Sequence, residues 1–138
     1  MRYVLDTNVV VAGLRSPNGA SAALLDHVLS ERFALLLSVA LALEYEAVCR
    51  DPAQRIVSGL SDEEVSTIVS ALCAVCEPVD ARYLWRPRLR DPADEMVLET
   101  AANGRADALV TFNRRNFGDA PAQFGVAPQT PREALRSL

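Results

Sequence analysis

The chain has 138 residues, half of them hydrophobic and 23% charged, which is globular composition and excludes a disordered or fibrous protein. This length suits one domain with a real core and is too short for two ordinary domains, so we expect a single domain over residues 1–138. The net charge of −4 argues against a general binder of polyanions. All fourteen basic residues are arginines, whose planar guanidinium groups suit phosphate.

The first part of the chain alternates apolar, β-branched runs with helical patterns. Its expected elements are a strand over 2–6, a helix from Val9 to the turn signal Ser16-Pro17-Asn18-Gly19, a helix over 21–31, a strand over 33–37 and a helix over 41–50 that Asp51-Pro52 ends. Ser61, with Glu64 three residues later, forms a capping box that opens a long helix reaching Val75.

The second part continues the alternation. Its expected elements are a short strand over 77–79, an extended segment over 85–90, a helix from Asp91 to Ala102, strands over 108–111 and 124–126, and a final helix capped by Thr130-Pro131-Arg132-Glu133. Strands separated by helices imply a parallel sheet covered on both faces. The sequence therefore predicts an α/β fold, a three-layer α/β/α domain with a central parallel sheet of four to five strands.

The cysteines do not indicate a metal or disulfide framework. Cys49, Cys73 and Cys76 are too few, and odd in number, for a disulfide scaffold. A zinc site would need them to converge with the only histidine, His27, whereas structural zinc sites usually bring two closely spaced ligand pairs. We interpret the cysteines as small buried hydrophobic residues.

The sequence also predicts where the protein works. No apolar run approaches the roughly 18–20 residues that a membrane-spanning helix needs. Met1 leads directly into the first expected strand without a targeting segment. We therefore expect a cytoplasmic protein that does not contact a membrane.

Several acidic residues lie where a ligand site would form. Asp6 directly follows the first strand, and the carboxyl ends of parallel strands are where α/β sheets bind ligands. Glu44 lies in a helix among apolar neighbours, and Asp91 and Asp94 begin a later helix. Singly, each could be a helix cap or a solvated side chain. Together they would repel one another unless a cation lay among them, and oxygen ligands alone suit Mg²⁺ or Mn²⁺.

Four short motifs carry a family resemblance across essentially the whole chain. They are Leu5-Asp6-Thr7-Asn8-Val9, Ala42-Leu43-Glu44, Asp94, and Leu109-Val110-Thr111-Phe112-Asn113. In order and spacing they resemble the PIN domain, and in particular the VapC-like toxins of toxin–antitoxin pairs. The resemblance implies a divalent-metal-dependent endoribonuclease with an RNA substrate, a small antitoxin protein as partner, and a homodimer.

The resemblance also implies roles for individual residues. Asp6, Glu44 and Asp94 are the expected catalytic carboxylates and ligands of Mg²⁺ or Mn²⁺, with Glu44 acting through water or positioning the nucleophilic water. The expected auxiliary residues are Thr7, Asn8, Asp91, Thr111, Asn113 and Asn116, and the candidate phosphate contacts are Arg114 and Arg115.

One position departs from the family pattern. Many relatives carry a fourth aspartate in a Thr-x-Asn-x-x-Asp-Phe pattern, where this chain has Asn116. Asparagine offers an oxygen but no charge, so we expect weaker metal affinity or the loss of a second metal. Asp119 lies close by in sequence and is the alternative fourth ligand.

Two other functions remain open at this stage. A metal-dependent DNA nuclease of the flap-endonuclease type adds helical arches, for which 138 residues leave no room. A non-catalytic PIN-domain scaffold is the second alternative, and Asn116 is a step in that direction. The retained carboxylates Asp6, Glu44 and Asp94 argue against a scaffold, and binding of Mn²⁺ would separate the two.

Overall fold

A computed structural model of the chain describes residues 1–83 and 88–138, so the expected extended segment over 85–90 lies partly outside the described residues. The strands of the described part are β1 (Arg2–Leu5), β2 (Ala34–Leu37), β3 (Glu77–Pro78), β4 (Ala108–Val110) and β5 (Ala127–Gln129). Its helices are α1 (Thr7–Arg15), α2 (Ala20–Leu29), α3 (Val39–Arg50), α4 (Pro52–Ser58), α5 (Asp62–Val75), α6 (Pro92–Gly104), α7 (Arg114–Phe117), α8 (Ala120–Gln123) and α9 (Pro131–Arg136).

The strands form one parallel sheet in the order β3-β2-β1-β4-β5, which confirms the predicted fold class. β1 is central, and its residue Tyr3 is in register with Leu35 on one side and Ala108 on the other. From β1 the chain first builds outward through β2 and β3, and later returns to place β4 and β5 on the other side. The order therefore reverses between β1 and β4, and open α/β sheets bind ligands at such a point, outside the carboxyl ends of the strands.

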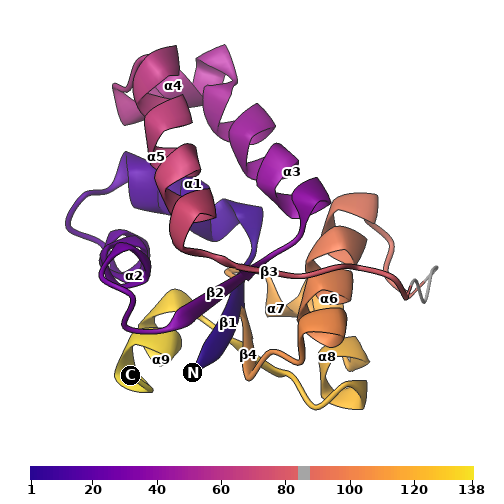
Figure 1. Ribbon diagram of the computed structural model, residues 1–138. Coiled ribbons are helices and arrows are strands. Elements are labelled where there is room, and N and C mark those ends of the chain that lie inside the picture. Colours follow the sequence, from indigo (N-terminus) through magenta and orange to yellow (C-terminus); the bar gives the residue numbers. More distant parts are fainter. Residues whose placement is uncertain (84–87) are drawn as a thin grey trace.

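Helices cover both faces of the sheet (Figure 1). α6 packs against β1, β2 and β4, with α8 beside it. On the other face α9 contacts β4 and β5, α5 contacts β2, and α2 lies between α9 and α5. α3 contacts both α1 and α6, so it closes the sheet's carboxyl end from above in this view. Among the described residues, no helix combines the length and apolar character needed to cross a membrane.

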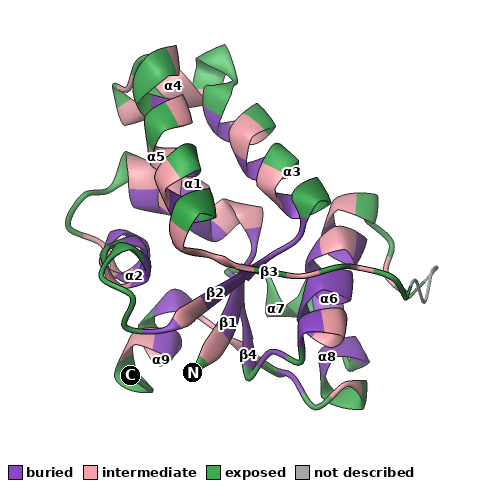
Figure 2. Ribbon diagram, in the orientation of Figure 1, coloured by how far each residue is buried: buried purple, intermediate pink, exposed green. Residues whose placement is uncertain are grey.

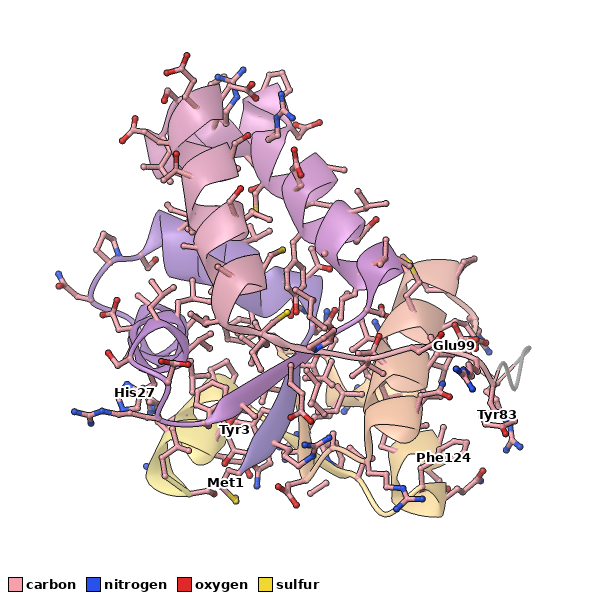
Figure 3. The ribbon with its side chains drawn as sticks, in the orientation of Figure 1. Met1, Tyr3, His27, Tyr83, Glu99 and Phe124 are labelled. Atoms are coloured by element: carbon pink, nitrogen blue, oxygen red, sulfur yellow. The ribbon has the colours of Figure 1, made fainter. Side chains whose placement is uncertain are left out.

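The core runs through the central strands and the inner faces of the helices (Figure 2). Tyr3, labelled in Figure 3, is fully buried and packs its ring against Phe33, with the ring centroids 4.9 Å apart. Tyr45 of α3 is also fully buried, and its hydroxyl donates a hydrogen bond to the carbonyl of Leu5. This bond fixes α3 to the last residue of β1, immediately before Asp6.

Two boundary predictions need correction. Asp51-Pro52 ends the helix α3 as predicted, but the same dipeptide starts α4, which the sequence analysis missed. Asp51 accepts a hydrogen bond from the Ala53 backbone N–H (2.9 Å), and proline is favoured in the first turn because its missing N–H has no partner there. The last strand is not over 124–126 but is β5, because Ala127 pairs with Ala108. Gly125, at a φ of +72°, instead forms the turn before it.

Candidate active site

Asp6 lies at the reversal point of the sheet, directly after β1. Its backbone N–H continues the sheet by donating to the carbonyl of Val110 (2.9 Å), and its carboxylate accepts a hydrogen bond from the Thr111 hydroxyl (2.7 Å). Asp6 occupies the N-cap position of α1, yet its side chain makes no capping hydrogen bond. The carboxylate is therefore oriented by the neighbouring strand and is not used to cap the helix, although it is only 7% exposed.

Thr111 holds this arrangement in place. It is fully buried after β4, and its backbone N–H donates to the carbonyl of Gln129 (2.9 Å), which anchors it to β5. Its hydroxyl oxygen also accepts from the backbone N–H of Asn113 (3.0 Å) while donating to Asp6. One side chain thus orients the carboxylate and begins the loop to α7, as expected for a residue that positions a metal ligand.

Asp94 comes from the first turn of α6. The helix starts at Asp91, whose carboxylate accepts from the Ala93 backbone N–H (2.9 Å), so Asp91 is the cap and Asp94 is not. The next residue, Glu95, is buried and accepts hydrogen bonds from the backbone N–H groups of Arg88 and Leu89 (2.7 Å each). Asp94 is 8% exposed, and within the described residues its carboxylate has neither a hydrogen bond nor an ion pair.

The acidic residues share one electrostatic environment. Burial raises the pKa of Asp94 to about 6, and the negative charges of Asp6 and Asp91 add to this shift. Burial also raises the pKa of Asp6; the hydrogen bond from Thr111 opposes this shift, while the charges of Asp91 and Glu44 reinforce it. No arginine of the described part forms an ion pair with Asp6 or Asp94. Among the described residues, the carboxylates of Asp6 and Asp94 therefore have no ion-pair partner, although Arg88, Arg90 and Arg115 line the same pocket as Asp94.

The donor set fits a hard divalent cation held by few protein ligands. In the described residues, no three His, Cys, Asp or Glu side chains are close enough together to hold one ion, so Asp6, Glu44 and Asp94 do not form a preformed cage. Mg²⁺ is usually bound through one or two carboxylates and keeps several waters or substrate phosphates as further ligands. Two nearly buried carboxylates without a cationic partner match that requirement. His27, by contrast, lies on α2 at the periphery of the molecule (Figure 3).

Two pockets open at this end of the sheet. We call the first, of about 620 Å³, the α1–α3 pocket; it is lined by Thr7, Asn8, Val11, Ala12, Arg15, Ser16, Glu44, Val48, Gln54, Phe112 and Asn113. The second, of about 450 Å³, is the α6 pocket; it is lined by Arg88, Leu89, Arg90, Asp91, Asp94, Arg115, Asn116, Phe117 and Gly118. Glu44 and Asp94 therefore face different pockets, and their common link is Asp6, with which both interact electrostatically.

The pockets also separate the predicted auxiliary residues. Asn116 lines the α6 pocket together with Asp91 and Asp94, whereas Asp119 is not among its lining residues. Arg115 lines the same pocket, but Arg114 forms an ion pair with Glu133 of α9 (3.1 Å). Of the two arginines expected to contact phosphate, Arg115 is thus the one placed beside the acidic residues.

The sequence analysis assigned no role to three residues of the α1–α3 pocket: Arg15, Gln54 and Phe112. Phe112 is 53% exposed directly after the buried Thr111, and an apolar residue between Thr111 and Asn113 was the available signal. Arg15 ends α1 and Gln54 lies on the unpredicted α4, so only the packing of these helices shows that they share a pocket.

The comparison with family models agrees with this geometry. A model described as a PIN domain matches residues 2–115, which is most of the chain, so the protein belongs to the PIN domain family. PIN domains are generally nucleases that use divalent metals, and nucleic acid is their class of substrate. Asp6, Glu44 and Asp94 lie within the matched range, and Asn116 lies just beyond it. None of the curated proteins compared with the chain matches it.

Proposed function

We propose that this protein is a divalent-metal-dependent endoribonuclease that hydrolyses RNA phosphodiester bonds at the carboxyl ends of β1 and β4. The observation that supports it most is the pair Asp6 and Asp94, nearly buried and without a cationic partner in the described residues. Burying a charge without a partner is expensive, so such a pair is expected where a ligand supplies the opposite charge. Membership of the PIN domain family supports a nuclease as that function.

Each residue then has a distinct task. Asp6 and Asp94 hold Mg²⁺ or Mn²⁺, and Thr111 keeps Asp6 in position. When bound, such an ion activates water and neutralises charge on a phosphodiester that undergoes in-line attack. Glu44, half-buried in the α1–α3 pocket, orients the attacking water, and Arg115 binds a phosphate from the α6 pocket.

The biological role is a further part of the proposal. The resemblance to VapC-like proteins supports a cytoplasmic toxin of a type II toxin–antitoxin pair that acts as a homodimer. A small antitoxin would neutralise it by placing a helix or a basic side chain in the acidic site. Growth arrest on expression, relieved by a small protein encoded next to this chain, supports the role. Expression without toxicity contradicts the toxin role and leaves the nuclease proposal intact.

Cleavage assays test the chemistry directly. Labelled RNA and DNA of the same sequence are incubated with the protein and Mn²⁺ or Mg²⁺, with EDTA and an Asp6→Asn variant as controls. We expect RNA cleavage that needs the metal and disappears in the variant. Cleavage of DNA alone supports the DNA-nuclease alternative. Failure to cleave any substrate, together with no Mn²⁺ binding in calorimetry, supports a scaffold and makes Asn116 the first residue to restore to aspartate.

A further inference from the structure

The α1–α3 pocket is larger than the placement of one catalytic water requires. Its volume of about 620 Å³ extends from Thr7 and Glu44 to Gln54 on α4, and the proposed chemistry uses only Glu44 among its lining residues. Ligand pockets of this size hold small organic groups and typically combine an apolar surface with a few polar contacts. The remaining lining residues therefore indicate which group the pocket accepts.

Phe112 supplies an aromatic surface to the α1–α3 pocket. It is 53% exposed, and it follows Thr111, whose hydroxyl binds Asp6. Phe112 also lines an adjoining pocket of about 510 Å³, which shares Ala12 and Ser16 with the first. An exposed ring where two pockets meet suits stacking against a flat group, and base–aromatic stacking contributes about 1–3 kcal/mol per base.

Each of these two pockets is lined by an arginine that suits the charged backbone of a nucleic acid. Arg15 lines the α1–α3 pocket and Arg132 lines the adjoining one. Within the described part of the chain, neither side chain makes an ion pair or a hydrogen bond, so both remain available to a ligand. Guanidinium groups bind phosphate oxygens through two parallel hydrogen bonds. A phosphate chain next to the acidic pair needs such contacts, because the carboxylates alone repel it.

Among the described residues, two amide oxygens of the α1–α3 pocket have no hydrogen-bond partner. Asn8 Oδ1 and Gln54 Oε1 are buried without a hydrogen bond, and both residues line the pocket. Leaving a buried polar atom unsatisfied costs about 1–3 kcal/mol, so such atoms indicate a missing donor. The edges of unpaired bases carry donors of this kind, namely the amino groups of adenine, cytosine and guanine and the ring N3–H of uracil.

We propose that the α1–α3 pocket binds one unstacked nucleotide of a single-stranded RNA, next to the bond that is cut. Phe112 stacks on its base, Gln54 accepts a hydrogen bond from an N–H on the edge of that base, and Arg15 binds the adjoining phosphate. The site selects single strands because a base held in a duplex cannot reach an aromatic ring in a pocket. This inference rests on the proposed ribonuclease function, since it names the substrate form that the same site accepts.

Binding without cleavage tests the stacking contact. In an Asp6→Asn background, fluorescence anisotropy measures the affinity for a labelled single-stranded RNA in the absence of divalent metal. We expect Phe112→Leu, which removes the ring but keeps an apolar side chain, to weaken binding about 5- to 100-fold. Phe112→Tyr keeps the ring and retains the affinity. Ile56→Ala, at an 83% exposed residue of α4 outside the pocket, is the matched control and leaves binding unchanged.

A spectroscopic readout reports on the stack itself. Trp85 is the only tryptophan of the chain, so Trp85→Phe combined with Phe112→Trp places the only tryptophan in the pocket, where it can be excited selectively. We expect single-stranded RNA to quench its fluorescence, and a duplex of the same sequence to quench it much less. Equal quenching by both forms overturns the selection of single strands.

The base-edge contact is tested with oligonucleotides of one base. Gln54→Leu removes the amide oxygen, and we expect it to weaken the binding of oligo(A), oligo(C) and oligo(U) to the Asp6→Asn protein, because each of these bases offers an N–H donor. Unchanged affinities in Gln54→Leu overturn this assignment.

The outcomes separate this inference from the proposed function. Metal-dependent RNA cleavage with equal affinities in Phe112→Leu and Phe112→Tyr overturns the nucleotide pocket and leaves the nuclease intact. Ring-dependent RNA binding without any cleavage supports the pocket and contradicts the nuclease. A change of oligomeric state in Phe112→Leu with unchanged RNA affinity assigns the ring to a protein contact and overturns the inference. Absence of RNA binding in this metal-free assay overturns the nucleotide pocket, while the nuclease proposal is decided by the cleavage assay.

Discussion

Among the described residues, the two ends of the parallel sheet differ in whether their charged side chains form ion pairs. At the amino end, the Arg2 guanidinium donates to the Glu77 carboxylate (2.6 Å) and the Gly104 carbonyl (2.6 Å), while the Arg2 backbone N–H donates to Asp107 (2.8 Å). At the carboxyl end, Asp6 and Asp94 have no cationic partner in the described part of the chain. The paired side chains Arg2 and Glu77 are 38% and 43% exposed, whereas the unpaired carboxylates are almost buried.

This distribution is the reverse of what stability alone favours. A half-exposed charge is already solvated, so its ion pair contributes little. A buried charge is stabilised most by an ion-pair partner, yet Asp6 and Asp94 have none among the described residues. Their burial instead raises the pKa values of both carboxyl groups. Departures from local energetic rules concentrate at functional sites. The comparison therefore supports the proposal that the carboxyl end binds a cation, whereas the amino end has a structural role.

The largest expected effect is on catalysis. Asp94→Asn removes one carboxylate of the acidic pair, and we expect RNA cleavage at saturating Mn²⁺ to fall by at least about 100-fold, because metal chemistry supplies several kcal/mol of transition-state stabilisation. Asp107→Asn removes the same charge at the opposite end of the sheet and serves as the matched control. Its cleavage rate should stay within about twofold of wild type. Equal losses in both variants would contradict the comparison.

The second largest effect is expected when a metal binds, because binding should raise the melting temperature of the protein. A cation that binds the folded protein stabilises it by about 2.7 kcal/mol at a concentration 100-fold above its Kd. In a chain of this size, each kcal/mol raises Tm by about 4 °C. Differential scanning fluorimetry should therefore show a Tm increase with Mn²⁺ that EDTA reverses. The increase should vanish in Asp94→Asn and persist in Glu77→Gln, at the paired end.

The sequence predicted the central strands well because their physical signal is strong. β1, β2 and β4 are buried apolar runs, and each differs from its predicted bounds by one residue at one end. β5 was misplaced by three residues because Phe124 and Val126 are apolar, whereas the position of the strand depends on pairing with β4. α4 was missed although Asp51-Pro52 and Asp91-Pro92 start their helices in the same way, since a proline after a helix was interpreted only as a terminator.

In the candidate site, too, some features are set by local sequence, whereas others are set by packing between distant residues. The position of Asp6 after a strand and of Asp94 in a first helical turn follows from local sequence. The hydrogen bond from Thr111 to Asp6 joins residues 105 positions apart and depends on β4 lying beside β1. The ion pair of Arg114 with Glu133 and the place of Gln54 in the α1–α3 pocket depend likewise on packing between distant helices.

The acidic pair should also make stability depend on pH. The folded protein raises the pKa of Asp94 from 3.8 to about 6, so between these values the native state binds protons more tightly than the unfolded chain. The free energy of unfolding should therefore fall as pH rises from about 4 to about 6, by about 1 kcal/mol once solvent screening is discounted. Urea unfolding in EDTA measures it. Asp94→Asn should flatten this pH dependence and be more stable than wild type at pH 7, whereas stability that rises over this range opposes the assignment.

The smallest effect belongs to the paired end of the sheet. Glu77→Gln removes the charge that faces Arg2, and because both side chains are about 40% exposed we expect a loss of only about 0.5 kcal/mol in the free energy of unfolding. Repeating the urea titration in 1 M NaCl should shrink the difference, since salt screens exposed charges. Cleavage should not change. A Glu77→Gln loss as large as the gain in Asp94→Asn would contradict the premise that the half-exposed ion pair contributes little to stability.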